Sequence, residues 1–311
     1  MNGASASTVT ATTATAERPR GYTGRFAPSP TGPLHLGSLT TALASCLEAR
    51  VHGGHWLLRI EDVDTTRAIP GVGAGFLRTL ESLGFCWDGP VIWQSARTAR
   101  YAEAVRQLRA NGRAYPCACT RRQLAAESEP GSGYPGTCRD GPQGPPPYAW
   151  RFRMDDRADI AFDDLLVGHC EPPRASLGDP IIVRRDGLHA YQLAVVVDDA
   201  DAGVTHVVRG RDLLESTPWQ LQLQSALALP HSCYAHLPLV TNANGSKLSK
   251  SAHTIPVVPE NAGDLLYKAL ILLKQNPPPV LAGAGVAELW SWARQHWQLN
   301  LLRGVGQLTP Q

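Results

Sequence analysis

Arg25-Phe-Ala-Pro-Ser-Pro-Thr-Gly-Pro-Leu-His-Leu-Gly-Ser38 is the stretch that decides the fold, because it joins the end of a strand to the start of a helix through a turn rich in proline and glycine. From Leu36 onward, apolar residues recur at three- and four-residue steps, which predicts a helix that begins near His35 and buries one face. Backbone N–H groups in the first turn of a helix lack intrahelical partners and carry partial positive charge. A strand-to-helix turn with Gly37 at this point is suited to bind a triphosphate, and we expect His35 to donate to its phosphates.

Two lysines lie far downstream, in Lys247-Leu-Ser-Lys-Ser251, after the loop sequence Asn242-Ala-Asn-Gly245. We expect Lys247 and Lys250 to stabilise charge that accumulates on phosphates in a transition state. Taken alone, each stretch has an ordinary explanation, because a histidine near a helix start is often a capping residue and paired lysines usually form a solvated face. The two stretches together, in this order, are specific.

Both stretches resemble signatures of the class I aminoacyl-tRNA synthetases. Pro28-Ser-Pro-Thr-Gly-Pro-Leu-His-Leu-Gly-Ser38 resembles their His-Ile-Gly-His signature in the form carried by glutamyl-tRNA synthetases, and Lys247-Leu-Ser-Lys-Ser251 resembles Lys-Met-Ser-Lys-Ser. Ser38 replaces the second histidine and Leu248 replaces methionine, and neither change removes a cation. Over about residues 22–275 the chain is most similar to the glutamyl-Q tRNA(Asp) synthetases, a family of short paralogues that place glutamate on a modified base.

The resemblance implies an α/β fold, namely a Rossmann-type class I synthetase catalytic domain with a small zinc-bearing insertion and a short C-terminal helical segment. We expect a disordered extension at residues 1–20, the two halves of the nucleotide-binding domain at 21–116 and 181–251, the insertion, which is similar to an acceptor-binding region, at 117–180, and a helical remnant at 252–311. The sixty residues after Ser251 leave no room for the anticodon-binding region of a full glutamyl-tRNA synthetase, which favours the shorter family.

Apolar periodicity predicts the secondary structure around these motifs. Helices are expected at residues 73–84, 96–112, 213–229, 262–274 and 286–297. Strands are expected at residues 56–62, 181–183, 191–199 and 204–212, where β-branched runs dominate. Residues 127–148 are crowded with glycine and proline, which argues against regular structure there.

Glu61 ends an apolar run, the pattern of a buried parallel strand whose carboxyl end opens on a site. The resemblance implies that Glu61 binds the α-amino group of glutamate while Arg25, Tyr191 and Arg209 hold its carboxylates. Arginine suits this task because its planar fork meets a carboxylate bidentately. The alternative is that the acidic residues of this run are solvated loop charges.

The remaining pocket residues also follow from the resemblance. It implies that Phe26, Ala27, Pro28 and Ser29 complete the glutamate pocket. It also implies that ATP is bound by His35, Gly37, Ser38 and Lys250.

Cys117-Ala-Cys119 and Tyr134-Pro-Gly-Thr-Cys138 supply three thiols within about twenty residues, enough for a structural zinc site if a fourth ligand is found. A phenolate is not a common zinc ligand, and Tyr134 is the fourth ligand that the resemblance implies. A metal would also order this glycine- and proline-rich segment. Chance proximity stays open as the alternative, because Cys-x-Cys spacing is less diagnostic than Cys-x-x-Cys.

Composition limits the possible classes of protein. No stretch approaches the ~18 apolar residues of a membrane span, and the first twenty residues lack the apolar centre of a secretory signal. Seven largely scattered cysteines fit a reduced cytoplasmic protein rather than a disulfide framework. The net charge of +2 is too small to indicate nucleic acid by itself. We therefore expect a cytoplasmic enzyme without membrane contact. We also expect a monomer, an expectation that does not rest on the composition.

The reaction that the resemblance implies has two steps. L-Glutamate and ATP with Mg²⁺ give glutamyl-adenylate without tRNA, and glutamate then passes to queuosine, the modified base at the wobble position of tRNA(Asp). Two alternatives stay open at this point: a truncated glutamyl-tRNA synthetase that charges the 3′ end of tRNA(Glu), and a catalytically dead, zinc-stabilised RNA-binding module. The presence of His35, Gly37, Lys247 and Lys250 disfavours the dead module, because a fold released from catalysis does not need them.

Overall fold

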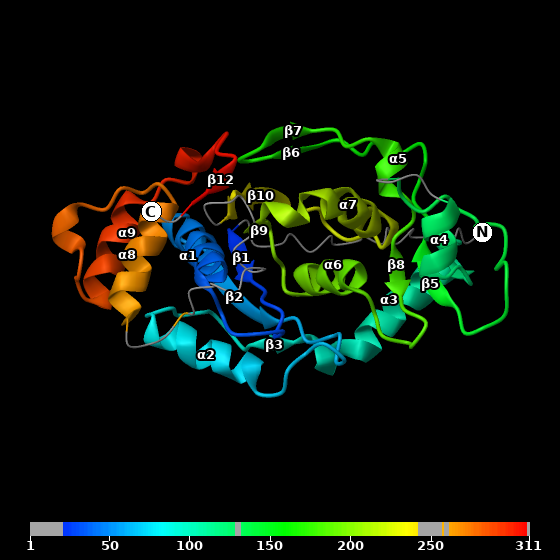
Figure 1. Ribbon diagram of the computed structural model, residues 1–311, viewed down its shortest axis with the longest axis horizontal. Helices are drawn as coiled ribbons and strands as arrows, with labels where there is room; N and C mark the ends of the chain where they lie inside the picture. The colour runs from blue at the N-terminus through cyan, green and yellow to red at the C-terminus, as the bar shows by residue number, and fades with distance from the viewer. Residues whose placement is uncertain (1–20, 128–131, 242–256, 258–260, 310–311) are drawn as a thin grey trace, which may run out of the picture.

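The computed structural model of the protein describes residues 21–127, 132–241, 257 and 261–309 (Figure 1). The strands are β1 (Thr23–Phe26), β2 (His55–Ile60), β3 (Ile92–Trp93), β4 (Ala114–Cys117), β5 (Ala149–Phe152), β6 (Phe162–Asp164), β7 (Gly168–Cys170), β8 (Ile181–Val183), β9 (His206–Gly210), β10 (Cys233–Leu237), β11 (Leu239–Val240) and β12 (Gln307–Leu308). The α-helices are α1 (Leu36–Val51), α2 (Val72–Ser82), α3 (Thr98–Ala110), α4 (Arg121–Glu127), α5 (Arg174–Leu177), α6 (Tyr191–Asp201), α7 (Thr217–Ala226), α8 (Ala262–Leu272) and α9 (Val286–His296). The 3-10 helices are η1 (Gln94–Arg97), η2 (Arg211–Ser216), η5 (Pro279–Leu281) and η6 (Leu299–Leu302).

Two sheets that lie side by side form one central sheet, which is parallel apart from one edge strand, as in a Rossmann-type fold. Strands β1, β2 and β3 pair in parallel, and the order β7-β6-β10-β9 forms a second sheet in which only β7 is antiparallel. The two sheets meet edge to edge, because the backbone N–H of Thr205 donates to the carbonyl of Thr23 at 2.9 Å and β9 packs beside β1. The carboxyl ends of β1, β2 and β9 therefore lie at one edge, where such sheets place their sites.

Helix α1 is buried around more of its circumference than the single face expected from periodicity. The small residues Ala42, Ala44 and Ala49 are buried along with the leucines. The reason is that α8 and α9 cover the side of α1 that faces away from the sheet, as Figure 1 shows. Burial of this kind fixes the position of the N-terminus of α1 relative to the strands.

The expected strand at residues 191–199 is wrong, because this segment is helix α6. Its run of valines has high intrinsic β-propensity, but Leu193 to Ala200 are all buried between α3, α7 and the strand β8. Helix and strand cannot be told apart by periodicity in a run that is buried on all sides, and tertiary packing overrides the propensity.

Most other expected elements are confirmed within a few residues. They include the helix after His35, the strand before Glu61 and the strand that carries Arg209. The domain boundaries stay a prediction, but strand pairing crosses the limit proposed between residues 180 and 181. Strand β8 pairs with β5 in the small antiparallel sheet β4-β5-β8, while β6 and β7 join β10 in the central sheet.

The C-terminal helices are anchored to the first half of the chain by two indole hydrogen bonds. Nε1 of Trp297 donates to the buried carboxylate of Glu48 on α1 at 2.6 Å, and Nε1 of Trp290 donates to the carbonyl of Leu83 at 2.8 Å. Within the described residues, no helix combines the length and the apolar character that crossing a membrane requires.

We expect Trp297→Phe to lower the free energy of unfolding by about 1–3 kcal/mol, because it leaves the buried Glu48 carboxylate without this donor. Chemical denaturation of purified protein measures the loss. Trp292→Phe is the matched control, since Trp292 is only partly buried and stacks on the exposed His296. Equal losses in the two variants would contradict the anchoring role of Trp297.

Candidate active site

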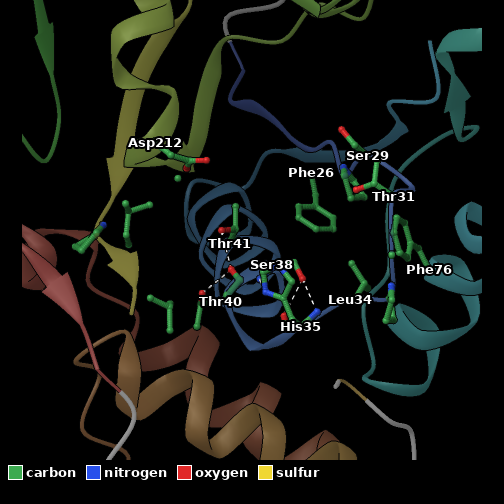
Figure 2. Close-up of a pocket in the computed structure, with 18 residues that line it drawn as sticks. Phe26, Ser29, Thr31, Leu34, His35, Ser38, Thr40, Thr41, Phe76 and Asp212 are labelled. Carbon is green, nitrogen blue, oxygen red and sulfur yellow. Dashed lines mark hydrogen bonds between the residues drawn. The ribbon is translucent and has the colours of Figure 1, made fainter. Parts of the chain in front are cut away.

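The turn between β1 and α1 opens on a cavity of about 520 Å³. Its wall includes Phe26, Pro28 and Ser29 from the turn and His35, Gly37 and Ser38 from the start of α1 (Figure 2). Asp212 and strand β11 line the opposite side. The first turn of a sixteen-residue helix thus faces a space large enough for a small ligand, which is the arrangement expected for binding of phosphates.

His35 is the N-cap of α1. Its Nδ1 accepts from the backbone N–H of Ser38 at 3.2 Å, and Oγ of Ser38 accepts from the backbone N–H of His35 at 2.8 Å, so the two residues form a capping box. A backbone N–H can only donate, so Nδ1 carries the lone pair and a neutral imidazole has its proton on Nε2. The capping role and the donor role expected from the sequence are therefore compatible.

Gly37 lies close to the imidazole of His35. A Cβ atom at this position would lie 3.1 Å from Nδ1 of His35, which is tighter than most real Cβ contacts. A larger residue would require the imidazole to shift by a few tenths of an ångström.

A second cavity of about 450 Å³ adjoins the first, since Ser29, Thr31 and Asp212 line both. Ala27, Glu61 and Tyr191 are in its wall. The structure thus places His35, Gly37 and Ser38 of the candidate ATP residues, and several of the candidate glutamate residues, around two adjoining cavities.

Arg25 and Glu61 are joined by a network of buried charges that the sequence alone did not reveal. The Asp199 carboxylate accepts from Nη1 of Arg59 at 2.6 Å and from Nε of Arg25 at 3.3 Å. Nη2 of Arg59 donates to Glu61 at 3.1 Å. Both Arg59 and Asp199 are buried, so each is held in place by the other.

Burial and the neighbouring arginines act in opposite directions on the pKa values of Glu61 and Asp199. Burial raises the pKa of Glu61 above its usual range, with Arg59 and Arg25 opposing the shift. Burial acts in the same direction on Asp199, but Arg59 and Arg25 outweigh it and hold the pKa of Asp199 below its usual range. An ammonium group bound beside Glu61 would favour its charged form.

The phenol of Tyr191 is close enough to Glu61 and the arginines for their charges to affect its pKa. Burial raises the pKa of its phenol, Glu61 adds to the shift, and Arg209 and Arg25 oppose it. Among the charged and phenolic candidates for the glutamate pocket, Glu61 and Tyr191 line one cavity, and Arg25 and Arg209 act on the Tyr191 phenol through their charge.

Arg209 is buried and held by a separate set of contacts. Its Nε donates to Nε2 of His236 at 2.9 Å, and Nδ1 of His236 is 2.6 Å from Oδ2 of Asp164. Burial lowers the pKa of His236 although Asp164 opposes the shift.

Sequence analysis missed Arg59, Asp199, Asp164 and His236. One signal was available, because Arg59 is a charged residue inside an apolar run, which is unusual in a buried strand unless it is paired. The structure does not describe Lys247 or Lys250, so their expected role lies outside the described residues.

The cysteines proposed as metal ligands come together. Within the described residues, Sγ of Cys117, Cys119 and Cys138 lie within 4.8 Å of one another, with 3.5 Å between the last two. The hydroxyl of Tyr134 is 3.5 Å from Sγ of Cys117 and 3.7 Å from Sγ of Cys119. A tetrahedral ion with bonds of about 2.3 Å to sulfur holds its sulfur ligands roughly 3.8 Å apart. The cluster therefore fits a metal ion.

Arg151 is placed to offset the negative charge that such a site would carry. Its Nε donates to Sγ of Cys117 at 3.3 Å, and its guanidinium carbon lies 3.6 Å from the centre of the Tyr134 ring. A cation beside thiolates stabilises their charged form, which is the form that binds metal.

The fold and these sites define the catalytic domain of a class I tRNA synthetase. Residues 22–274 match the family model for tRNA synthetases class I (E and Q), catalytic domain. A glutamate tRNA ligase from Elizabethkingia meningosepticum superposes with a TM-score of 0.76 at 26% identity, covering 93% of this chain and 67% of that one.

Two curated relatives narrow the class. Glutamyl-Q tRNA(Asp) synthetase of Aromatoleum aromaticum is 53% identical over 283 residues, which is 89% of each chain. The protein of the same name from Thiobacillus denitrificans is 52% identical over 288 residues, which is 91% of this chain and 95% of that one. The chain belongs to the glutamyl-Q tRNA(Asp) synthetase family.

We expect Cys119→Ser to abolish binding of one metal ion per chain and to lower the melting temperature by about 5 °C or more, because an ion bound here would tie the Cys117 strand to the Cys138 loop. Elemental analysis of dialysed protein and thermal melts measure the two effects. Cys170→Ser is the matched control, since Cys170 is also a partly buried thiol but lies outside the cluster. Equal metal content in the Cys119→Ser and Cys170→Ser variants would refute the assignment of the metal site to this cluster.

Proposed function

We propose that this chain activates L-glutamate with ATP, without tRNA, and transfers the glutamyl group to queuosine in tRNA(Asp). The observation that carries the proposal is the identity of about one half, over about nine tenths of the chain, with relatives named glutamyl-Q tRNA(Asp) synthetase. Glu61 and Tyr191 line the cavity that adjoins the one at the N-terminus of α1, and the charges of Arg25 and Arg209 act on Tyr191, which supports glutamate as the amino acid.

In the proposed first step, an oxygen of the glutamate α-carboxylate attacks the α-phosphorus of ATP bound with Mg²⁺. A P–O bond to the leaving group breaks, pyrophosphate departs and glutamyl-adenylate remains. The start of α1, including Gly37 and Ser38, would bind the phosphates, and Nε2–H of His35 would donate to them. Lys247 and Lys250 would add positive charge as the pyrophosphate leaves.

The glutamate pocket is proposed to balance the charges of its ligand. Glutamate has two carboxylates and one ammonium group, and the site offers Arg25, Arg209 and the Tyr191 hydroxyl against Glu61. Phe26, Ala27, Pro28 and Ser29 would form the wall on the side of the turn. Glutamine would be rejected because its neutral amide leaves a buried guanidinium without an anionic partner.

In the proposed second step, a hydroxyl of queuosine attacks the carbonyl carbon of glutamyl-adenylate. The bond to the phosphate oxygen breaks, AMP leaves, the hydroxyl proton is released to the departing phosphate or to water, and an ester joins glutamate to the modified base. No side chain has to act as nucleophile.

The metal in the cysteine cluster is proposed to be a structural zinc ion. Three thiols match the sulfur ligands that zinc takes in closed tetrahedral sites, and the Tyr134 hydroxyl, although an uncommon zinc ligand, is the fourth donor atom beside them. All four ligands would come from the protein, which leaves no open position for substrate. Its role would be to order the segment around Tyr134 and Cys138.

Transfer of radiolabelled glutamate tests the acceptor. We expect label on tRNA(Asp) that contains queuosine, and none on tRNA(Asp) that lacks it or on tRNA(Glu), because only queuosine offers the proposed hydroxyl. Label on tRNA(Glu) would mean charging of an ordinary 3′ end, and no label on any tRNA would favour a binding module.

Two variants test the roles of the site residues in pyrophosphate exchange. Arg25→Ala should raise the KM for glutamate by roughly 10–100-fold with the KM for ATP unchanged, since a charge-assisted hydrogen bond is lost. Lys250→Ala should instead slow adenylate formation by about 100-fold with little change in glutamate binding. Arg106→Ala is the control, because Arg106 is exposed and pairs only with Glu103 in the described structure. A change in the KM for ATP alone with Arg25→Ala would refute the pocket assignment.

A further inference from the structure

Arg209 is held differently from the other two buried arginines of the site. Arg25 and Arg59 each donate to the carboxylate of Asp199. By contrast, every acceptor that Arg209 reaches in the described part of the chain is uncharged. These acceptors are Nε2 of His236 at 2.9 Å, Oε1 of Gln220 at 2.7 Å, Oγ1 of Thr217 at 2.9 Å and the carbonyl of Leu213 at 3.2 Å. Four of the five guanidinium N–H groups therefore donate to uncharged acceptors, and no carboxylate among them neutralises the positive charge.

The contact between Arg209 and His236 determines where the imidazole carries its proton. Nε of an arginine can only donate, so Nε2 of His236 has to carry a lone pair. The proton of the neutral ring is therefore on Nδ1, which donates to Oδ2 of Asp164 at 2.6 Å. His236 is 1% exposed, so water does not compete for either nitrogen.

Asp164 is itself fixed by backbone donors. Its Oδ1 accepts from the N–H of Leu166 at 3.0 Å and of Val167 at 2.9 Å, and its Oδ2 accepts from the N–H of His236 at 3.1 Å. A carboxylate held in this way selects one tautomer of the histidine and one orientation of the ring.

We propose that the Asp164–His236 pair is a positioning device that orients Arg209 toward a carboxylate of bound glutamate while leaving the arginine charge unneutralised. A carboxylate bonded directly to Arg209 would orient it equally well but would neutralise the charge needed for the ligand. A neutral imidazole supplies the acceptor without that cost. This inference rests on the proposed function and deepens it, by naming His236 and Asp164 as positioning residues for recognition of glutamate.

Asp164→Asn tests the device by changing the tautomer. The amide would donate to Nδ1 of His236, which moves the ring proton to Nε2, where it opposes Nε–H of Arg209. In glutamate-dependent pyrophosphate exchange, we expect the KM for glutamate to rise about tenfold or more while the KM for ATP and kcat change little. His236→Phe should give the same result, and His236→Gln, which keeps an acceptor near Nε2, should restore most of the affinity.

Asp163→Asn is the matched control for Asp164→Asn. Asp163 is the preceding residue on β6, and its exposed side chain pairs with the exposed His169. The KM values of the Asp163→Asn variant should therefore match those of the unaltered protein. Thermal melts establish that each variant is folded. An unchanged KM for glutamate in folded Asp164→Asn and His236→Phe, or an equal rise in the KM for ATP, would overturn the proposal.

Two further measurements distinguish failure of the proposed function from failure of the positioning proposal. Absence of exchange by the unaltered protein would refute the proposed function itself. If the variants do not fold, ¹⁵N spectra of the unaltered chain still test the device, because we expect one buried imidazole with an exchange-protected Nδ1–H and an unprotonated Nε2. Finding a proton on Nε2 of this ring would overturn the proposal.

Discussion

The ion pairs of the Asp199 carboxylate with Arg25 and Arg59 connect the fold to the candidate site. Asp199 lies on α6 and accepts hydrogen bonds from Arg25 on β1 and from Arg59 on β2, residues 174 and 140 positions away in the chain. Isolated charges are costly to bury, so each of these groups needs the others in place. The contact ties the strands of the first half of the chain to the helix of the second half, and in doing so it presents Arg25 and Glu61 at the edge of the sheet. Building the core and building the pocket are thus one process.

Three buried arginines meet at this edge, and the protein treats their charges in two ways. Arg25 and Arg59 are paired with carboxylates, which makes them part of the scaffold. Arg209 is surrounded by uncharged acceptors and by the ring of Tyr234, whose centre lies 5.0 Å from the guanidinium carbon. The imidazole of His236 lies between Arg209 and the carboxylate of Asp164, and in the proposed role it would orient this cation for an anionic ligand without neutralising it.

The cysteine cluster organises the other end of the molecule by similar means. It joins β4 to the segment around Tyr134 and Cys138, where described residues form loops rich in glycine and proline. Asp179 reinforces the connection, since it accepts from the hydroxyl of Tyr115 at 2.5 Å and from Arg139 at 2.6 Å. A segment with so little regular structure has few backbone hydrogen bonds of its own, so thiols and buried ion pairs supply its order.

Local chemistry in the sequence determined the strand-turn-helix at Arg25 to Ser38, the carboxylate of Glu61 at a strand end and the set of three cysteines. Each of these depends on residues that are near one another in the chain, within about twenty positions for the cysteines, through capping, periodicity or ligand spacing. Only the tertiary structure decided that residues 191–201 form a helix, because burial on all sides removes the alternation that separates helix from strand. It also decided that Asp199 pairs with Arg25 and that Asp164 reaches Arg209 through His236. These buried polar partners are far apart in the chain, by 174 residues for Arg25 and Asp199 and by 72 for Asp164 and His236, so no local pattern in the sequence records the pairing.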